Sequence, residues 1–213
     1  MKTKDFLKLG KQLLPKMPGF VMEKKVMFKS PVGDIMYGIS FESSQDAEWF
    51  YLWDFFLPLF VPNDSVHGTF GKRIGHDINW TINNPNLMAD LSAAVYNEGL
   101  PFFDRISTLR GALDYLNGRI ESCGPRVNSH VLEAHAYGLI KIGDYSLARK
   151  SLTALIQMLK GDPIPWVIEQ RNRALLIEQK LEQHPEFALA QLDVWKAETV
   201  RNLGLEKYVA IKP

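Results

Sequence analysis

The stretch from Trp49 to Phe56 constrains this chain more than any other, because seven of its eight residues are large and apolar. In a strand, successive side chains point to opposite faces. One face then carries Trp49, Tyr51, Trp53 and Phe55, and the other carries Phe50, Leu52, Asp54 and Phe56. A sheet with one face in water does not explain two apolar faces. We therefore expect a central strand over residues 47–56, covered by the protein's own helices and loops or, in the alternative, by a partner molecule.

Other strand patterns flank this run. Residues 20–29 and 35–42 are separated by Ser-Pro-Val-Gly-Asp, in which Pro presets φ and Gly supplies a positive φ. Two strands joined by so short a turn form an antiparallel hairpin. A fourth, shorter strand is expected over residues 75–82. Ahead of the sheet, residues 3–14 have a ragged apolar stripe that Pro15 and Pro18 end, which predicts an amino-terminal helix.

After residue 86, the spacing of apolar residues changes from the two-residue repeat of a strand to the repeat of about 3.6 residues of a helix. We expect helices over 87–97, with Gly99 as a stop, and from a cap at Asp104 or Ser107 to about 121. Further helices are expected over 128–141, 145–160, 164–183 and 186–203, and their short connections predict antiparallel neighbours. The fold class is therefore α+β: a helix and a four-stranded antiparallel sheet packed by helices, then an all-helical half. Gly124-Pro125 suggests an α+β domain over 1–122 and a helical-hairpin subdomain over 125–213, with a shared core left open.

Composition excludes several functional classes. The 213 residues are 46% hydrophobic, and 25 basic against 24 acidic residues leave a formal charge of +1, which gives no general attraction to nucleic acid or anionic membranes. Residues 1–34 do carry eight lysines against three acidic residues, so an anion-attracting edge stays open as an alternative to a solvated face. There is no secretory signal and no stretch near the ~20 apolar residues of a membrane span. With one cysteine, which we take as structural, we expect a cytoplasmic protein.

The most chemistry-like cluster lies next to a glycine-rich segment and contains Lys72, Arg73, His76 and Asp77. A histidine with an orienting carboxylate can serve as a general base. Adjacent strand residues point to opposite faces, however, so His76 and Asp77 are poorly placed to pair. His130 and His135 flank a glutamate, but five residues on a helix turn them about 140° apart, which excludes a shared zinc ion. We predict no catalytic residue, no metal site and no cofactor.

Residues 130–160 resemble a single tetratricopeptide-like helical hairpin. Gly143-Asp144-Tyr145 forms the tight turn of that pattern, and Ala148 is the small residue at which two helices approach. The resemblance covers about 30 residues. Superhelices of such repeats need at least three copies, and the sequence has one convincing copy. An ordinary helical hairpin is the alternative.

The layout of residues 1–120 resembles an uncharacterised bacterial domain family of unknown function. The similar pieces are the opening helix, Gly19-Phe20 followed by lysines, Ile39 to Ser44, Trp80, and Leu100 to Ile106. No activity follows from this resemblance. Some small α+β proteins of this kind accompany bacterial toxins as immunity partners, which implies a binding role.

These observations favour a non-catalytic protein-interaction module with a protein partner or a second copy of the chain. Its predicted contact residues are Trp49, Tyr51, Trp53 and Phe55, because exposed aromatic side chains dominate binding energy in such surfaces. The alternative is a small-ligand binder or an enzyme that uses the 62–77 loop over a cleft between sheet and helices. Nucleic-acid binding through the amino-terminal lysines is a third, less favoured hypothesis.

Overall fold

The computed structural model describes residues 2–76, 78–124 and 128–209, and the chain divides into two compact units. The sheet unit comprises Met1–Leu57, Val66–Ser107 and Lys207–Pro213, within the described residues. The helical unit comprises Pro58–Ser65 and Thr108–Glu206. The division falls between Ser107 and Thr108 rather than at the predicted 122–125 boundary, and Pro125 lies outside the described residues. Helix α4 (Leu109–Cys123) packs against the following helix α5 (Ser129–Lys141), which is why it groups with the later helices.

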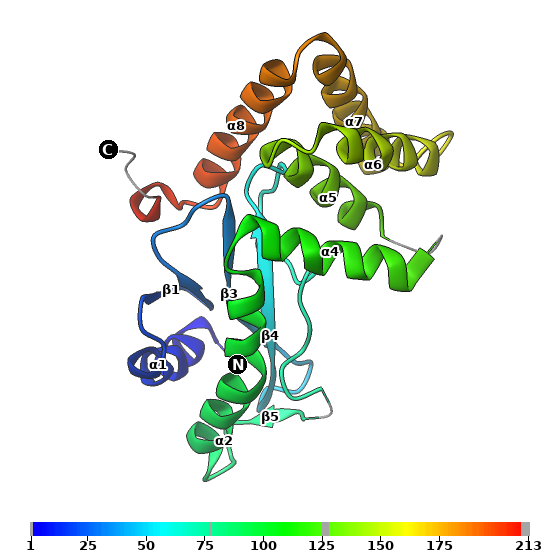
Figure 1. Ribbon diagram of the computed structural model, residues 1–213. Helices are drawn as coiled ribbons and strands as arrows, with labels where there is room; N and C mark the ends of the chain where they lie inside the picture. The colour runs from blue at the N-terminus through cyan, green and yellow to red at the C-terminus, as the bar shows by residue number, and fades with distance from the viewer. Residues whose placement is uncertain (1, 77, 125–127, 210–213) are drawn as a thin grey trace. The chain divides into compact units, whose positions relative to one another are not determined.

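The sheet unit is built on five antiparallel strands in sequence order (Figure 1). Their bounds are β1 Phe20–Glu23, β2 Val26–Lys29, β3 Ile35–Ser43, β4 Trp49–Pro58 and β5 Trp80–Thr81. The aromatic stretch is strand β4, and it lies inside the sheet between β3 and β5. The predicted α+β fold, with its opening helix and antiparallel sheet followed by paired helices, is confirmed.

The predicted strand over 20–29 is wrong in one respect, because it is a hairpin of two strands. Glu23 pairs with Val26, and Lys24 between them has a φ of 53°. A lysine in this left-handed region is uncommon, and the segment contains neither the glycine nor the asparagine that normally marks such a turn. The sequence therefore carries no turn signal at this position.

The predicted strand over 75–82 is also shorter than expected, since only Trp80–Thr81 forms β5. Residues 72–74 lie beside β4 and form two backbone hydrogen bonds with it. Ile74 N–H donates to Leu52 O at 2.8 Å, and Asp54 N–H donates to Lys72 O at 3.0 Å. The segment before β5 thus forms backbone hydrogen bonds with β4 through Lys72 and Ile74 but does not form a regular strand.

Helices cover one face of this sheet. Helix α1 (Thr3–Leu13), followed by the 3-10 turn Leu14–Lys16, places the Phe6 ring 5.6 Å from that of Phe41 and 5.9 Å from that of Phe50. The face of β4 that contains Phe50 is therefore the helix-covered face. Helices α2 (Leu87–Ala94) and α3 (Leu100–Ile106) follow the sheet.

Gly99 does not stop a helix, contrary to the prediction. Helix α2 continues through a π-helical turn, η2 (Val95–Gly99), directly into α3. Gly99 is buried, and a Cβ at this position would lie 3.4 Å from a methyl group of Ile74 and 3.6 Å from the Phe103 ring. Gly99 thus lies inside a continuous helical segment, packed beside Ile74 and Phe103, and does not terminate it.

The helical unit contains α4 and α5 together with α6 (Tyr145–Met158), α7 (Pro165–Gln183) and α8 (Pro185–Asn202). The last four helices match the predicted ranges to within two residues. Side-chain caps at Thr108, Asn128, Asp144 and His184 begin α4, α5, α6 and α8. The cap of α4 is thus Thr108 rather than Asp104 or Ser107. No helix of the described chain is long and apolar enough to cross a membrane.

Helix α5 is the centre of the helical unit. Its residues 131–140 are all buried, and it packs against α4, α6 and α8. The segment Pro58–Ser65 joins this unit through Phe60 and Val61, which are buried. Thr199 of α8 donates a hydrogen bond to Val61 O at 3.1 Å. After α8, a short 3-10 turn (Glu206–Tyr208) leads back to the sheet unit.

Candidate functional site

The four aromatic residues predicted as a binding face share one side of β4, opposite the helix-covered side. Phe55 is buried, Tyr51 and Trp53 are half-buried, and Trp49 at the end of the strand is 38% exposed. Residues of the 66–73 segment cover this side: the Arg73 guanidinium lies 4.1 Å from the centre of the Tyr51 ring, and Gly68 approaches the Trp53 indole. The cover of β4 is therefore mainly intramolecular, and Trp49 alone is classed as exposed.

The described members of the predicted polar cluster, Lys72, Arg73 and His76, have different surroundings. Arg73 donates through Nη2 to Ile78 O and to Asn79 Oδ1, each at 2.6 Å, in addition to its contact with Tyr51. Lys72 points toward Glu98, with 4.0 Å between Nζ and Oε2. His76 is exposed, and Asp77 lies outside the described residues. The structure thus brings Arg73 together with the β4 aromatic face, whereas Lys72 lies toward Glu98.

Two carboxylates hold the 71–75 segment in place. Asp54 is fully buried, and its Oδ1 accepts the Lys72 N–H at 2.6 Å, while its Oδ2 is a buried oxygen without a hydrogen-bond partner in the described chain. Glu98 accepts the Gly75 N–H with both oxygens, at 3.1 and 3.2 Å. Burial raises the pKa of Asp54 to about 6, although the backbone hydrogen bond and charge of Lys72 oppose that shift.

A cavity of about 370 Å³ opens on the same side of the sheet as Trp53. Its floor is formed by four strand residues, and its walls by the turn between β1 and β2 and by the 66–68 segment. The lining residues are Lys25, Ser40, Glu42, Trp53, Phe55, Val66, His67 and Gly68. Of the predicted site residues, only Trp53 and Phe55 belong to this lining, so the 62–77 loop contributes residues other than those predicted.

The helical unit contains a buried polar network that no sequence pattern indicated. Glu133 on α5 is fully buried and accepts from Arg173 Nε at 2.9 Å, Arg173 Nη2 at 3.1 Å and Gln170 Nε2 at 2.8 Å. Gln170 also accepts from Ser129 Oγ at 2.8 Å. These bonds join α5 to α7. Because every partner is a protein side chain, the network is satisfied within the helices and has a structural role.

The two histidines that flank Glu133 have separate surroundings. His130 stacks on Trp166 with ring centres 5.6 Å apart, and His135 Nδ1 lies 3.1 Å from Ser151 Oγ on α6. Burial lowers the pKa of His135, which favours its neutral form. Within the described residues, no group of three or more His, Cys, Asp and Glu side chains is arranged to hold a metal ion. Cys123 is half-buried at the end of α4.

The outward face of α7 carries large apolar side chains. Val167, Ala174, Ile177 and Leu181 form its buried face, together with Gln170. On the other side, Ile168 is 44% exposed, and Leu175 and Leu176 are each 37% exposed. At about 100° per residue, these three positions lie within one arc, roughly opposite the buried face. We call Ile168, Leu175 and Leu176 the α7 stripe.

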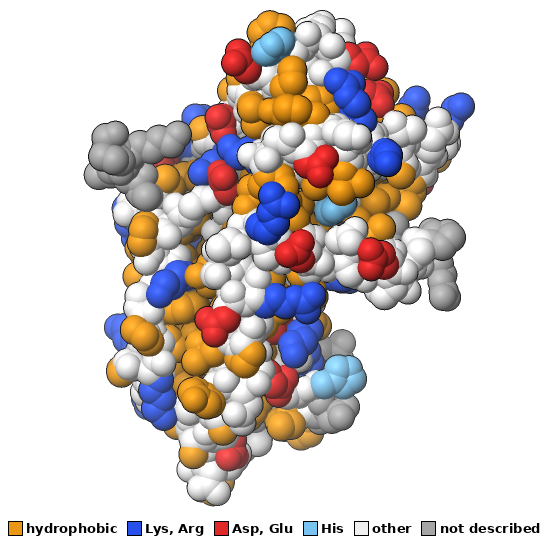
Figure 2. All heavy atoms as spheres, in the orientation of Figure 1, with side chains coloured by type: hydrophobic (Ala, Val, Ile, Leu, Met, Phe, Trp, Pro, Cys, Tyr) orange, Lys and Arg blue, Asp and Glu red, His pale blue; other side chains and the backbone are white. Residues whose placement is uncertain are grey.

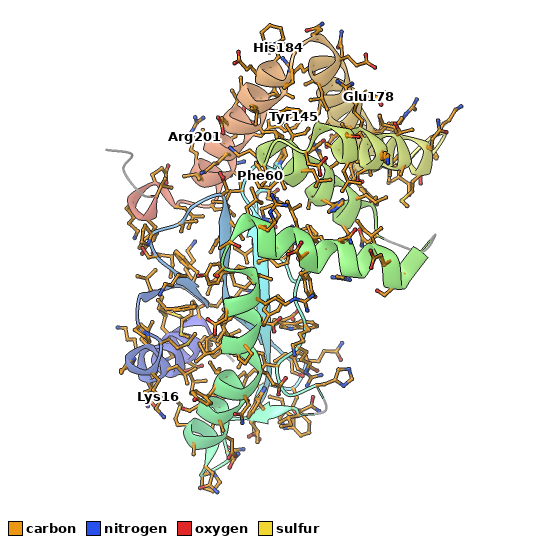
Figure 3. All side chains as sticks on the ribbon, viewed as in Figure 1. Lys16, Phe60, Tyr145, Glu178, His184 and Arg201 are labelled. Atoms are coloured by element: carbon orange, nitrogen blue, oxygen red, sulfur yellow. The ribbon has the colours of Figure 1, made fainter. Side chains whose placement is uncertain are left out.

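Neighbouring elements of the helical unit expose further apolar groups. Phe187 and Val194, seven residues apart on α8, are 53% and 51% exposed, and Trp166 at the start of α7 is 51% exposed. Figure 3 shows Glu178 on α7 and His184 at the junction between α7 and α8, and Figure 2 shows hydrophobic side chains gathered beside the histidine at that junction. The Phe187 ring lies 6.1 Å from that of His184.

Comparisons of the chain with protein-family models, curated proteins and solved structures give no significant match. The candidate sites therefore depend on geometry alone. The sequence does contain a signal for the α7 stripe, because apolar residues at 168, 175 and 176 do not belong to the stripe formed by 167, 174, 177 and 181. The buried Glu133 had no comparable signal.

Proposed function

We propose that this protein is a non-catalytic interaction module, which binds a protein partner or a second copy of itself through the α7 stripe. The observation that carries the proposal is that α7 exposes three large apolar side chains on the side opposite its buried face. A surface helix normally carries one apolar face toward its own core and polar residues on the opposite side. An outer apolar face therefore favours burial against another molecule.

The form of the helical unit supports this function. Helices α7 and α8 pack on one another, and α7 also packs on α6, so the stripe lies on a folded support. The buried bonds of Glu133 with Gln170 and Arg173 fix α7 on α5. A rigid helix loses little conformational freedom on binding, which favours affinity.

The aromatic face of β4 is a less suitable contact surface than the sequence indicated. Tyr51 is covered by Arg73, and Phe55 is buried. We expect Trp53→Ala to lower the free energy of unfolding, since the indole packs beside Gly68, and to leave partner binding unchanged in the fraction that folds. Trp49, which is 38% exposed, is the most exposed member of that face.

Covering one half-exposed leucine or isoleucine contributes on the order of 1 kcal/mol, so a single substitution would change binding only slightly. The test therefore uses the double variant Ile168→Lys/Leu175→Lys. Ala190→Lys/Ala197→Lys is its matched control, because these α8 positions are also exposed, lie seven residues apart and receive the same charge. The monomer mass is 24.3 kDa.

The measurement is the size of the native complex, by gel filtration of gentle extracts from cells that express each form in place of the natural chain. We expect the wild type and the control to elute well above the monomer and the α7 variant to elute as the monomer. Thermal unfolding of the purified forms should be similar, because all four positions are exposed. Elution of all three forms as monomers, or of all three in the same complex, would contradict the proposal.

A further inference from the structure

The cavity beside Trp53 is the strongest candidate for a second site, and it lies entirely within the sheet unit. Ser40 and Glu42 are alternate residues of β3, and Trp53 and Phe55 are alternate residues of β4, so each pair lies on one face of the sheet. Phe41, between the first pair, contacts Phe6 of α1 on the other face. The cavity therefore opens on the side of the sheet away from α1.

Its floor is aromatic. Phe55 is fully buried, whereas Trp53 is half-buried and lines the opening. Gly68 lies above it, and a Cβ at this position would come within 3.7 Å of the indole ring. A glycine here leaves the indole accessible from the cavity. A planar ring system is the group that such a floor binds best, because offset stacking adds to the burial of apolar area.

Two opposite charges line the same cavity. Lys25 comes from the turn between β1 and β2, and Glu42 from the end of β3, and both side chains are exposed. Neither forms an ion pair with another residue in the part of the chain that the structure describes. A ligand that offers a carboxylate to Lys25 and an ammonium to Glu42 would complement both groups.

From these features we infer that the cavity binds a small zwitterion with a planar aromatic ring, such as a free aromatic amino acid. The volume of about 370 Å³ lies at the lower end of the range for small-molecule sites, which suits a ligand of this size. The ring stacks over Trp53, the carboxylate faces Lys25 and the ammonium faces Glu42. This inference is independent of the α7 stripe, which belongs to the other unit.

Four related probes test the two charges separately: L-tryptophan as zwitterion, indole-3-acetate as anion, tryptamine as cation, and indole as the neutral ring. Dissociation constants are measured with the purified full chain by isothermal titration calorimetry. We expect L-tryptophan to bind at least fivefold more tightly than any other probe. Lys25→Met should weaken binding of L-tryptophan about fivefold and leave binding of tryptamine unchanged. Glu42→Gln should also weaken binding of L-tryptophan about fivefold, and it should leave binding of indole-3-acetate unchanged.

Two further variants make the result specific to the cavity. Gly68→Val places a side chain over the Trp53 indole and should abolish binding of all four probes. Lys24→Met removes the neighbouring charge of the same turn, which does not line the cavity, and should leave every affinity within twofold. Absence of binding by all four probes at millimolar concentration, equal binding of all four, or equal effects of Lys24→Met and Lys25→Met would overturn the inference.

Discussion

Arg173 on α7 donates two hydrogen bonds to the carboxylate of Glu133 on α5, which is fully buried. Such two-point contact between guanidinium and carboxylate fixes the relative orientation of the two side chains as well as their distance. It therefore sets the rotation of α7 about its own axis, and with it the direction in which the α7 stripe faces.

Removal of Arg173 should be more damaging than removal of the whole pair. Arg173→Met leaves the carboxylate of Glu133 buried without its cation, and we expect a loss of about 3–5 kcal/mol in the free energy of unfolding. The double variant Glu133→Leu/Arg173→Met should lose less, because no buried charge is left. Urea denaturation measures both values, and a double variant less stable than Arg173→Met would contradict this account.

Asp54 should make the sheet unit less stable as the pH rises. Its pKa is about 6 in the fold, where burial disfavours the charged form, against an ordinary value of 3.8. The folded state thus holds more protons than the unfolded state between these values, so stability falls as the pH rises from about 4 to 6. The stability of wild type minus that of Asp54→Asn should fall by about 2–3 kcal/mol between pH 4 and 7, as measured by denaturant unfolding at each pH. A constant or rising difference would contradict the assignment.

Glu23 should anchor the carboxy-terminal segment. Its Oε2 accepts from Lys207 Nζ and from the Tyr208 hydroxyl, each at 3.0 Å, and these bonds lower the pKa of Glu23. Tyr208 O in turn accepts the Val32 N–H at 2.8 Å. Because the folded pKa is depressed, this contribution is present at neutral pH and is lost as the pH falls through that pKa. Glu23→Gln should therefore speed hydrogen exchange of the Val32 amide at neutral pH, and an unchanged rate would count against the anchor.

Gly38 should tolerate no side chain. A Cβ there would lie 1.9 Å from Met27 O on the neighbouring strand β2, which is backbone and has no room to move without parting the strands. Gly38→Ala should cost about 3 kcal/mol of unfolding free energy. Gly33→Ala is the control, because nothing lies within 4 Å of its Cβ position, and it should change stability by less than about 0.5 kcal/mol. Thermal melts of the two variants should differ clearly, and equal melting temperatures would rule out the close approach.

The sequence predicted the fold class because its main patterns, a long doubly apolar strand and well-capped helices, admit few alternative structures. The stretch from Trp49 to Phe56 has too much apolar surface for an edge strand, and the helices after residue 128 have caps and short connections. Local patterns failed where tertiary packing decided the outcome. Lys24 forms a turn without a turn residue, and Gly99 lies buried within a continuous helical segment rather than after its end.

Less of the candidate site was predictable. The sequence places Trp53 and Phe55 on one strand face, but only the fold adds Lys25 and Glu42 to the same cavity. The turn between β1 and β2, which carries Lys25, had no sequence signal, so the position of Lys25 beside β3 could not be predicted. The same is true of Glu133, whose partners Gln170 and Arg173 lie 37 and 40 residues away.

Solvent protection of the α7 stripe tests the proposed function most directly. Hydroxyl-radical footprinting compares the oxidation of Leu175 and Leu176 in the purified chain at low concentration with that in the native complex. Tyr96, which is 71% exposed and belongs to the sheet unit, serves as the internal reference. We predict that oxidation of the two leucines falls at least threefold in the complex while that of Tyr96 is unchanged, and equal oxidation of the leucines in both states would contradict the proposal.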